Sequence, residues 1–343
     1  MTTRNNEVAQ DRRPFLKTMA SYSGGLMLAG CAANFEAALA WGADSADWRN
    51  RMGLELFTVR DLTPDWKSYA STLAKVAEIG YQEIEASGAH AGLDPKAFRA
   101  ILDSLGLRMP STHWDATEGP DLEKQLEGFQ ILGIHYAVIG PAHRPKFVEP
   151  VTAEDRKRVL AAIAAMPPQT QDAVKRTAAE YNRHGKIARK FGIKMLIHNH
   201  TVEFAPLADN PNLRPYDILL AETDPELTAM QLDIGWAALA GQDIVGMFRK
   251  NPGRYELWHV KDAKTSRLDP KATEAERFKA TFQDDLLVPV GEGDIDYKQI
   301  FANAKLAGLK HFYIEQDNAL QYERGGSLAA SKTSYQNLRR MLS

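Results

Sequence analysis

A short phrase recurs along this 343-residue chain: a helix-like run with apolar residues at helical spacing, then a glycine, then a short apolar strand-like run. The glycines occupy the position just after a helix, which favours this residue, at Gly80, Gly106, Gly133, Gly192 and Gly308. Repeats of this phrase build parallel strands joined by helices, and eight of them make a (β/α)8 TIM barrel. An open, doubly wound sheet is the alternative, which we favour less because no glycine-rich phosphate turn follows the first strand.

The expected elements belong to one barrel domain over residues 41–343. The predicted strands are 53–57, 81–86, 108–113, 135–140, 193–199, 228–233, 256–260 and 311–315. The clearest helix-like runs are 66–79, 95–105, 122–132, 173–191, 216–222, 244–250 and 297–307. Two connections are longer than ordinary loops, at about 141–171 and 264–289. Both leave strand C-terminal ends, so we expect insertions that border the barrel mouth and cover the substrate.

Four strand-like runs in the second half end on metal-ligand side chains. They are MLIHNHTVEF with His200 and Glu203, MQLDIGW with Asp233, LWHVKD with His259, and FYIEQD with Glu315. Any one of these side chains alone is more typical of a helix N-cap or a salt bridge. Together they describe the C-terminal mouth of a barrel, where the chemistry of that fold is located.

A set of three carboxylates and one imidazole predicts one divalent metal, Mn²⁺, Mg²⁺, Co²⁺ or Zn²⁺, held by Glu203, Asp233, His259 and Glu315. A metal so placed polarises a carbonyl and stabilises the enediolate that forms when the adjacent C–H loses its proton. Carboxylates beside the metal are suited to move that proton, which makes Glu203 and Glu315 candidate catalytic residues.

The fourth ligand position stays open between Glu203 and His200. Alternate residues of a strand point to opposite faces, so His198 and His200 share a face and Asn199 points away. We favour Glu203 as the ligand and place His200 near the substrate, as a candidate catalytic base, with His198 as a substrate contact.

Other candidates follow from their places at strand ends. Lys261 lies two residues after His259 and points to the same side, where a cation holds a developing oxyanion. The alternative interpretation of Lys261 is a surface lysine that pairs with Asp262. Glu85 and His113 end the second and third predicted strands, and we expect them to bind substrate hydroxyl groups. Trp236 is a candidate to stack on a sugar face.

The N-terminal 40 residues predict export. Arg12-Arg13-Pro14-Phe15-Leu16-Lys17 is a twin-arginine pattern before a moderately apolar stretch, as in a Tat signal. Cleavage after Ala40 gives a soluble protein from Trp41. The lipobox at residues 28–31 instead gives a lipoprotein anchored through Cys31, the only cysteine, so no intramolecular disulfide forms. Either route predicts a periplasmic or exported protein that uses the Tat machinery.

The formal net charge of −2 leaves no basic surplus to hold a nucleic-acid backbone. We therefore expect a small-molecule carbohydrate as partner, no nucleic acid, and a homo-oligomer as an open alternative to a monomer.

From about residue 53 to 318 the chain resembles the sugar phosphate isomerase/epimerase family, which has a xylose isomerase-like TIM barrel. The phrases that carry the resemblance are LELFTVRD, GYQEIEASG, IHNHTVEFAPL, YDILLAETDPEL, QLDIGWAALAG, NPGRYELWHVKD, VGEGDIDYKQIFANAKLAGLK and YIEQDN. The resemblance implies a divalent metal at the mouth, with Glu203, Asp233, His259 and Glu315 at the ligand positions and Lys261 as the lysine that follows the ligand histidine. The family includes ketose epimerases, inosose dehydratases and enzymes that cleave 3-keto-glycosides.

The export signal argues against a sugar phosphate, because such compounds are mainly cytoplasmic. The leading hypothesis is a metal-dependent isomerase or epimerase of an unphosphorylated sugar or keto-sugar. The alternative is a 3-keto-glycoside lyase or hydrolase that uses β-elimination at the same site. A non-catalytic sugar-binding protein and a metal-dependent phosphodiesterase are weaker hypotheses, the latter because no rich histidine set or basic groove is apparent.

Overall fold

The computed structural model describes residues 48–87, 94–140, 169–269, 271–273, 276–277 and 286–343. The predicted signal with Cys31, and all but the last residues of the predicted insertion at 141–171, lie outside the described residues. Residues from Asp47 to Ser343 form one compact unit. Within the described part of the chain, no helix has the length and apolar character that crossing a membrane requires.

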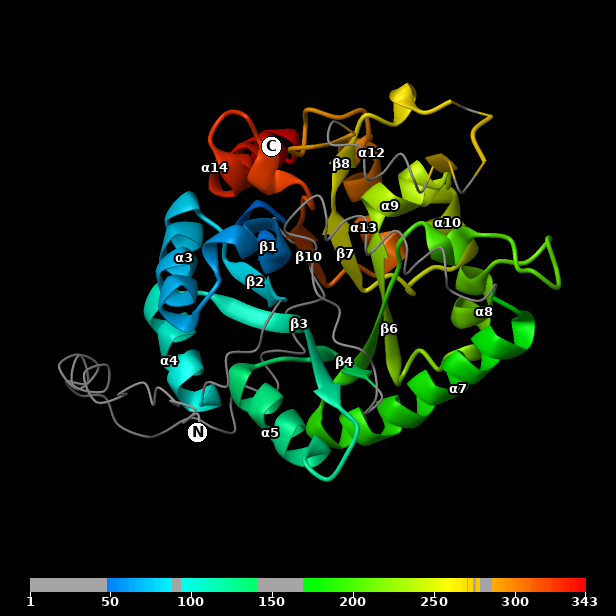
Figure 1. Cartoon of the computed structure of the whole chain (residues 1–343), viewed down its shortest axis with the longest axis horizontal. Coiled ribbons are helices and arrows are strands. Elements are labelled where there is room, and N and C mark those ends of the chain that lie inside the picture. The colour runs from blue at the N-terminus through cyan, green and yellow to red at the C-terminus, as the bar shows by residue number, and fades with distance from the viewer. Residues whose placement is uncertain (1–47, 88–93, 141–168, 270, 274–275, 278–285) are drawn as a thin grey trace, which may run out of the picture. The chain divides into compact units, whose positions relative to one another are not determined.

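Eight parallel strands close into a barrel in the order β1-β10-β7-β6-β5-β4-β3-β2 (Figure 1). They are β1 (Gly53–Glu55), β2 (Glu83–Ala86), β3 (Arg108–Thr117), β4 (Tyr136–Gly140), β5 (Lys194–His198), β6 (Thr228–Asp233), β7 (Leu257–Val260) and β10 (His311–Ile314). Each predicted strand is present, so the TIM barrel is confirmed and the open sheet is wrong. A separate antiparallel pair consists of β8 (Asp262–Ala263), just before the second predicted insertion, and β9 (Leu287–Val288), inside it.

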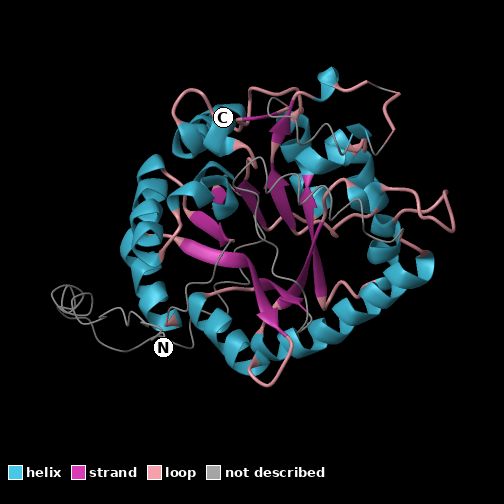
Figure 2. Ribbon diagram, viewed as in Figure 1, coloured by secondary structure: helices cyan, strands magenta, loops and turns pink. Residues whose placement is uncertain are grey.

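Helices surround the strands, as the cyan and magenta ribbons of Figure 2 show. The α-helices are α3 (Trp66–Ile79), α4 (Pro95–Leu105), α5 (Leu122–Leu132), α7 (Gln171–Ala188), α8 (Pro215–Glu222), α9 (Ile234–Leu239), α10 (Ile244–Lys250), α12 (Tyr297–Ala302), α13 (Ala304–Ala307) and α14 (Gly326–Met341). Short 3-10 turns are η1 (Trp48–Asn50), η2 (Leu56–Leu62), η3 (Arg189–Phe191), η4 (Val202–Phe204), η5 (Thr265–Arg267) and η6 (Ala319–Gln321).

Local signals explain where these helices begin and end. Asp65 starts α3 by accepting a hydrogen bond from the Ser68 amide at 2.8 Å, and Gly80 ends it with a left-handed φ of 117°. The predicted run 297–307 is two helices, because the chain breaks at Asn303. Two further helices were not predicted from the sequence. α9 is buried on nearly every side, and α14 faces the core partly with serines.

The barrel interior is closed below the mouth by a layer of apolar side chains. Tyr136, Leu196, Leu257 and Tyr313 pack together there. Gly53 makes room for the Tyr313 ring, since a Cβ on Gly53 would lie 2.5 Å from Tyr313 Cδ1. The polar residues at the strand ends are therefore gathered on one side of this layer, where β/α barrels carry their active sites.

Candidate active site and metal centre

Three of the predicted ligands meet at the mouth of the barrel. Asp233 ends β6, His259 lies in β7, and Glu315 follows β10 directly. One ligand atom from each lies within 4.8 Å of those of the other two, and all three residues are buried. Segments some 80 residues apart in the sequence are thus brought together by neighbouring strands of the sheet.

Lys261 lies against the same carboxylates. Its Nζ is 2.9 Å from Asp233 Oδ2, 3.1 Å from Glu315 Oε2 and 2.8 Å from Asp317 Oδ2, and it stands 4.4 Å from the centre of the Trp236 ring. Burial lowers the pKa of Lys261, but these carboxylates outweigh it and raise the pKa above its usual value. The pairing of a surface lysine with Asp262 is not observed, because the Asp262 carboxylate accepts backbone amides instead.

His259 is held between two carboxylates, one at each ring nitrogen. Its Nε2 lies 2.5 Å from Glu85 Oε2, and its Nδ1 lies 2.6 Å from Glu315 Oε2 and 3.7 Å from Asp233 Oδ2. Burial lowers the pKa of His259, yet Glu315 and Glu85 together raise it well above its usual value. Glu85 thereby fixes the ring so that Nδ1 faces Asp233 and Glu315, as a carboxylate behind a ligand histidine does in metal sites.

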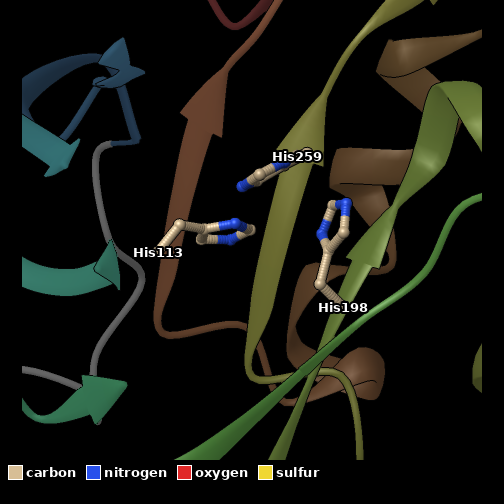
Figure 3. A group of neighbouring side chains, drawn as sticks. All are labelled: His113, His198 and His259. Atoms are coloured by element: carbon tan, nitrogen blue, oxygen red, sulfur yellow. The ribbon is translucent and has the colours of Figure 1, made fainter. Parts of the chain in front are cut away.

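A second group of side chains adjoins the first. Figure 3 shows the rings of His113, His198 and His259, which come from β3, β5 and β7 and turn toward one another. Their ligand atoms also lie within 4.8 Å of one another. His113 Nε2 and His198 Nδ1 are, however, 2.7 and 3.1 Å from one oxygen, Gln231 Oε1. These two nitrogens are therefore engaged as hydrogen-bond donors, and the three-histidine group fits a metal poorly.

The Asp233–His259–Glu315 group fits a divalent metal on two grounds. First, its inward atoms have short contacts but no well-directed hydrogen bond: Asp233 Oδ2, His259 Nδ1 and Glu315 Oε2 are all buried without a hydrogen-bond partner among the described residues. Buried polar atoms are normally satisfied, so converging atoms whose contacts are only the ion pairs with Lys261 and within the group leave room for a further partner. Second, two carboxylates and an imidazole are ligands that Mg²⁺, Mn²⁺ and Zn²⁺ accept.

The two candidates for the fourth ligand lie outside this group. Glu203 lies in η4 and its Oε2 accepts a hydrogen bond from the backbone amide of His200 at 2.6 Å. The His200 side chain is exposed, with its ring centre 4.9 Å from that of His198 and 6.0 Å from that of Trp236. Neither joins the three converging residues in this arrangement, and both remain predictions as the fourth ligand.

Glu55 and Gln231 are residues of the site that the sequence reasoning missed. Glu55 ends β1 and is buried; its Oε2 accepts the Phe57 amide at 2.6 Å, while its Oε1 has no partner among the described residues. Burial, followed by repulsion from Glu315, raises the pKa of Glu55 well above its usual value. Gln231, in β6, links Glu85 to the two histidines. Inward positions recur every second residue, so Gln231 could have been found by counting back from Asp233.

Comparisons with known proteins agree with this geometry. The sequence model of the family described as xylose isomerase-like TIM barrel matches residues 73–331. An inosose dehydratase from Geobacillus kaustophilus (strain HTA426) is 25% identical over 239 residues, which cover 67% of this chain and 73% of that protein.

Solved structures are similar in fold at lower identity. A sugar phosphate isomerase/epimerase from Parabacteroides distasonis ATCC 8503 superposes with a TM-score of 0.59 at 20% identity, covering 87% of this chain and 95% of that one. A xylose isomerase-like TIM barrel protein from Mycobacterium smegmatis, solved in complex with magnesium, gives a TM-score of 0.58 at 16% identity, covering 87% and 98%.

Proposed function

Since the chain belongs to the xylose isomerase-like TIM barrel family, we propose that it is a divalent-metal-dependent isomerase or epimerase of an unphosphorylated sugar or keto-sugar. The observation that carries this proposal is the convergence of Asp233 Oδ2, His259 Nδ1 and Glu315 Oε2, buried and without hydrogen-bond partners at the barrel mouth. The Mycobacterium smegmatis protein of similar fold was solved in complex with magnesium, which supports the choice of a divalent metal.

Asp233, His259 and Glu315 would hold the metal, with Glu203 or His200 as the fourth ligand. When bound, the metal polarises the substrate carbonyl and stabilises the negative charge that develops as the neighbouring C–H loses its proton. Burial raises the pKa of Glu315, but Lys261 and His259 lower it by more, so this carboxylate stays ionised. It is thus able to bind a cation.

Lys261 acts as a cation in this scheme. Its raised pKa keeps the ammonium protonated, so it suits holding an oxyanion or donating a proton and is a poor base. The proton of the substrate C–H goes to Glu203 or Glu315, and the return of a proton to the other face or the neighbouring carbon gives the epimer or the isomer. His200, exposed beside Trp236, is available to a substrate that enters from the mouth.

A lyase is the second candidate, because a relative from Geobacillus kaustophilus that covers 67% of the chain is named an inosose dehydratase. In a β-elimination the same proton leaves, and a hydroxyl group or an aglycone then departs from the next carbon. The two functions share their first step and differ only in the product.

One experiment tests the proposal. The metal-loaded protein is incubated in D₂O with free ketoses, inososes and 3-keto-glucosides, and the products are followed by NMR. A deuterated epimer or isomer supports the isomerase, whereas loss of water or of the aglycone supports the lyase. If no compound exchanges the proton next to its carbonyl, removal of that proton is not the chemistry of this site.

A matched pair of variants links the result to the metal group. Asp233 and Asp243 each cap a helix, accepting the Trp236 amide at 2.8 Å and the Gly246 amide at 3.0 Å. Asp243 is not in the metal group. We expect Asp233→Asn to abolish exchange and bound metal, and Asp243→Asn to keep both.

We also propose that the protein is exported through the Tat pathway and acts outside the cytoplasm, as the Arg12-Arg13 pattern indicates. Replacing both arginines by lysine should retain the protein in the cytoplasm. If cell fractionation finds the variant and the parent protein in the same compartment, export through the Tat pathway is refuted. The argument against sugar phosphates is then refuted as well, because it depends on export.

A further inference from the structure

The end of the barrel opposite the mouth carries basic residues that the proposed reaction does not use. This end, which we call the base, is formed by the first residues of the barrel strands and the last turns of the helices that precede them. Lysine or arginine occupies the last turns of α7, η3, α10, α13 and α14. Such residues complement the partial negative charge at a helix C-terminus, so by themselves they indicate no partner.

An open hollow lies among three of these cations at the end of α7 and η3. It has a volume of about 340 Å³ and is lined by three basic side chains, one acid and one apolar residue: Lys186, Arg189, Lys190, Asp224 and Leu227. The three basic residues are exposed, and none forms an ion pair within the described residues. Asp224 Oδ1 accepts the Glu226 amide at 2.8 Å. The hollow therefore keeps a net positive charge and suits an anionic group.

The base also carries exposed apolar side chains. Among the described residues two large apolar side chains are exposed, Ile131 by 40% and Leu306 by 36%. Each is the last residue but one of its helix, α5 or α13, so both lie at the base. Basic and large apolar side chains on one face are typical of surfaces that lie on a bilayer, where the cations meet the headgroups and the apolar groups enter the interface.

The N-terminal part of the chain joins the barrel at the same end. Trp48 packs at the start of β10, with its ring centre 6.0 Å from that of Phe312, and β1 begins five residues later. Cys31, the residue that the predicted lipobox would modify, precedes Trp48 by 17 residues. A chain of that length reaches at most about 60 Å. A lipid anchor at Cys31 would therefore keep the base, and not the mouth, next to the membrane.

We infer that the base of the barrel is a membrane-facing surface that binds an anionic bilayer. Headgroup phosphates occupy the hollow beside α7, and Ile131 and Leu306 enter the interface. The inference rests on the proposed export, which brings the protein to a membrane, and goes beyond the proposed reaction. The mouth then points away from the bilayer, and the metal group stays open to substrates in solution.

Vesicle sedimentation tests this surface without substrate. The form that begins at Trp41, the product of the predicted cleavage after Ala40, lacks the apolar signal and contains the whole compact unit from Asp47 to Ser343. We expect it to bind vesicles that contain one third phosphatidylglycerol at least about tenfold more tightly than vesicles of pure phosphatidylcholine. Added salt should weaken the binding, because it screens exposed charges.

Two matched triple variants decide where the protein binds. The base variant carries Lys186→Gln, Arg189→Gln and Lys190→Gln. The mouth variant replaces by glutamine three exposed lysines in the first turns of α3, α4 and α12: Lys67, Lys96 and Lys298. The base variant should bind the anionic vesicles roughly a hundredfold more weakly, because each basic residue near such a surface strengthens binding about fivefold. The mouth variant loses the same charge more than a screening length away and should bind like the parent protein.

A third variant tests the apolar contacts. Ile131→Ser combined with Leu306→Ser keeps every charge of the base. We expect it to bind the anionic vesicles about tenfold more weakly, because less apolar surface leaves water. Melting curves that match the parent protein establish that each variant is folded.

The outcomes are distinct from those for the reaction and for export, since the assay uses neither substrate nor cells. A parent protein that binds no vesicles, or binds both kinds equally, would refute the membrane-facing surface. Equal losses in the base and mouth variants would refute its place at the base. Binding to soluble polyglutamate as tight as to the anionic vesicles would assign the base to acidic polymers and overturn the inference.

Discussion

Replacing Lys261 by methionine should destabilise the metal-free protein, because Lys261 is the buried cation among the site carboxylates. Its Nζ lies 2.8 to 3.1 Å from oxygens of Asp233, Glu315 and Asp317. Removing one partner of a buried ion pair costs about 3–5 kcal/mol. The Asp317 side chain is 28% exposed and remains partly solvated, so we expect a loss of about 3 kcal/mol. For a unit of nearly 300 residues that loss corresponds to a fall in Tm of roughly 5 °C.

The measurement is thermal unfolding by circular dichroism in EDTA and again with saturating Mg²⁺ or Mn²⁺. A bound dication supplies the positive charge that the variant lacks, so the gap to wild type should narrow in metal. Lys298→Met, an exposed lysine on α12, is the control and should match wild type in both buffers. A Lys261→Met protein that melts within roughly 2 °C of wild type in EDTA would refute the reasoning, as would a gap that widens with metal.

Three further predictions concern single residues. Burial lowers the pKa of His259, but Glu315 and Glu85 raise it above the unfolded value near 6.5, so protonated His259 stabilises the metal-free fold fully below about pH 6.5. This stabilisation is lost as the pH rises through the higher folded pKa, so the Tm in EDTA should fall as the pH rises from about 6.5 and should fall less in His259→Gln. A wild-type Tm that does not change with pH would contradict this prediction. Asp262→Asn should lower the stability by about 2 kcal/mol or more in denaturant titrations, because backbone amides donate to both carboxylate oxygens and an NH₂ group must oppose some of them. Glu203→Gln should weaken metal binding at least tenfold in competition with a chelator, and an unchanged affinity would leave His200 as the fourth-ligand candidate.

The fold was predictable because its signals are local. Apolar runs, helical spacing and glycines at helix ends repeat along the chain, and each unit can be recognised without knowing its neighbours. Gly80 illustrates this, since its left-handed φ of 117° follows from the end of one helix alone. α9 was missed for the opposite reason: it is packed among other elements, so its burial on nearly every side removes the polar face that marks a helix in sequence.

The site was predictable only where ligand chemistry stood out. Asp233, His259 and Glu315 are conspicuous at the ends of apolar runs, and the barrel does bring them together. Gln231 and Glu55 carry no such mark, because a strand glutamine or glutamate is ordinary until its neighbours across the barrel are known. Their roles depend on contacts over long sequence separations, such as the 146 residues between Gln231 and Glu85, which no local pattern contains.

The charges at the mouth explain why these residues form one system. Asp233 and Glu315 are buried, and Lys261 and His259 are the cations beside them. Glu55 is a further buried carboxyl group, and its pKa is raised by burial and then by Glu315. Carboxylates thus compete for too little positive charge in a region of low dielectric. A dication at the converging atoms would relieve that competition, lowering the pKa of Glu55 and displacing the proton from His259 Nδ1. Metal affinity should therefore increase with pH over the range in which metal-free stability falls, because the same proton is lost in both processes.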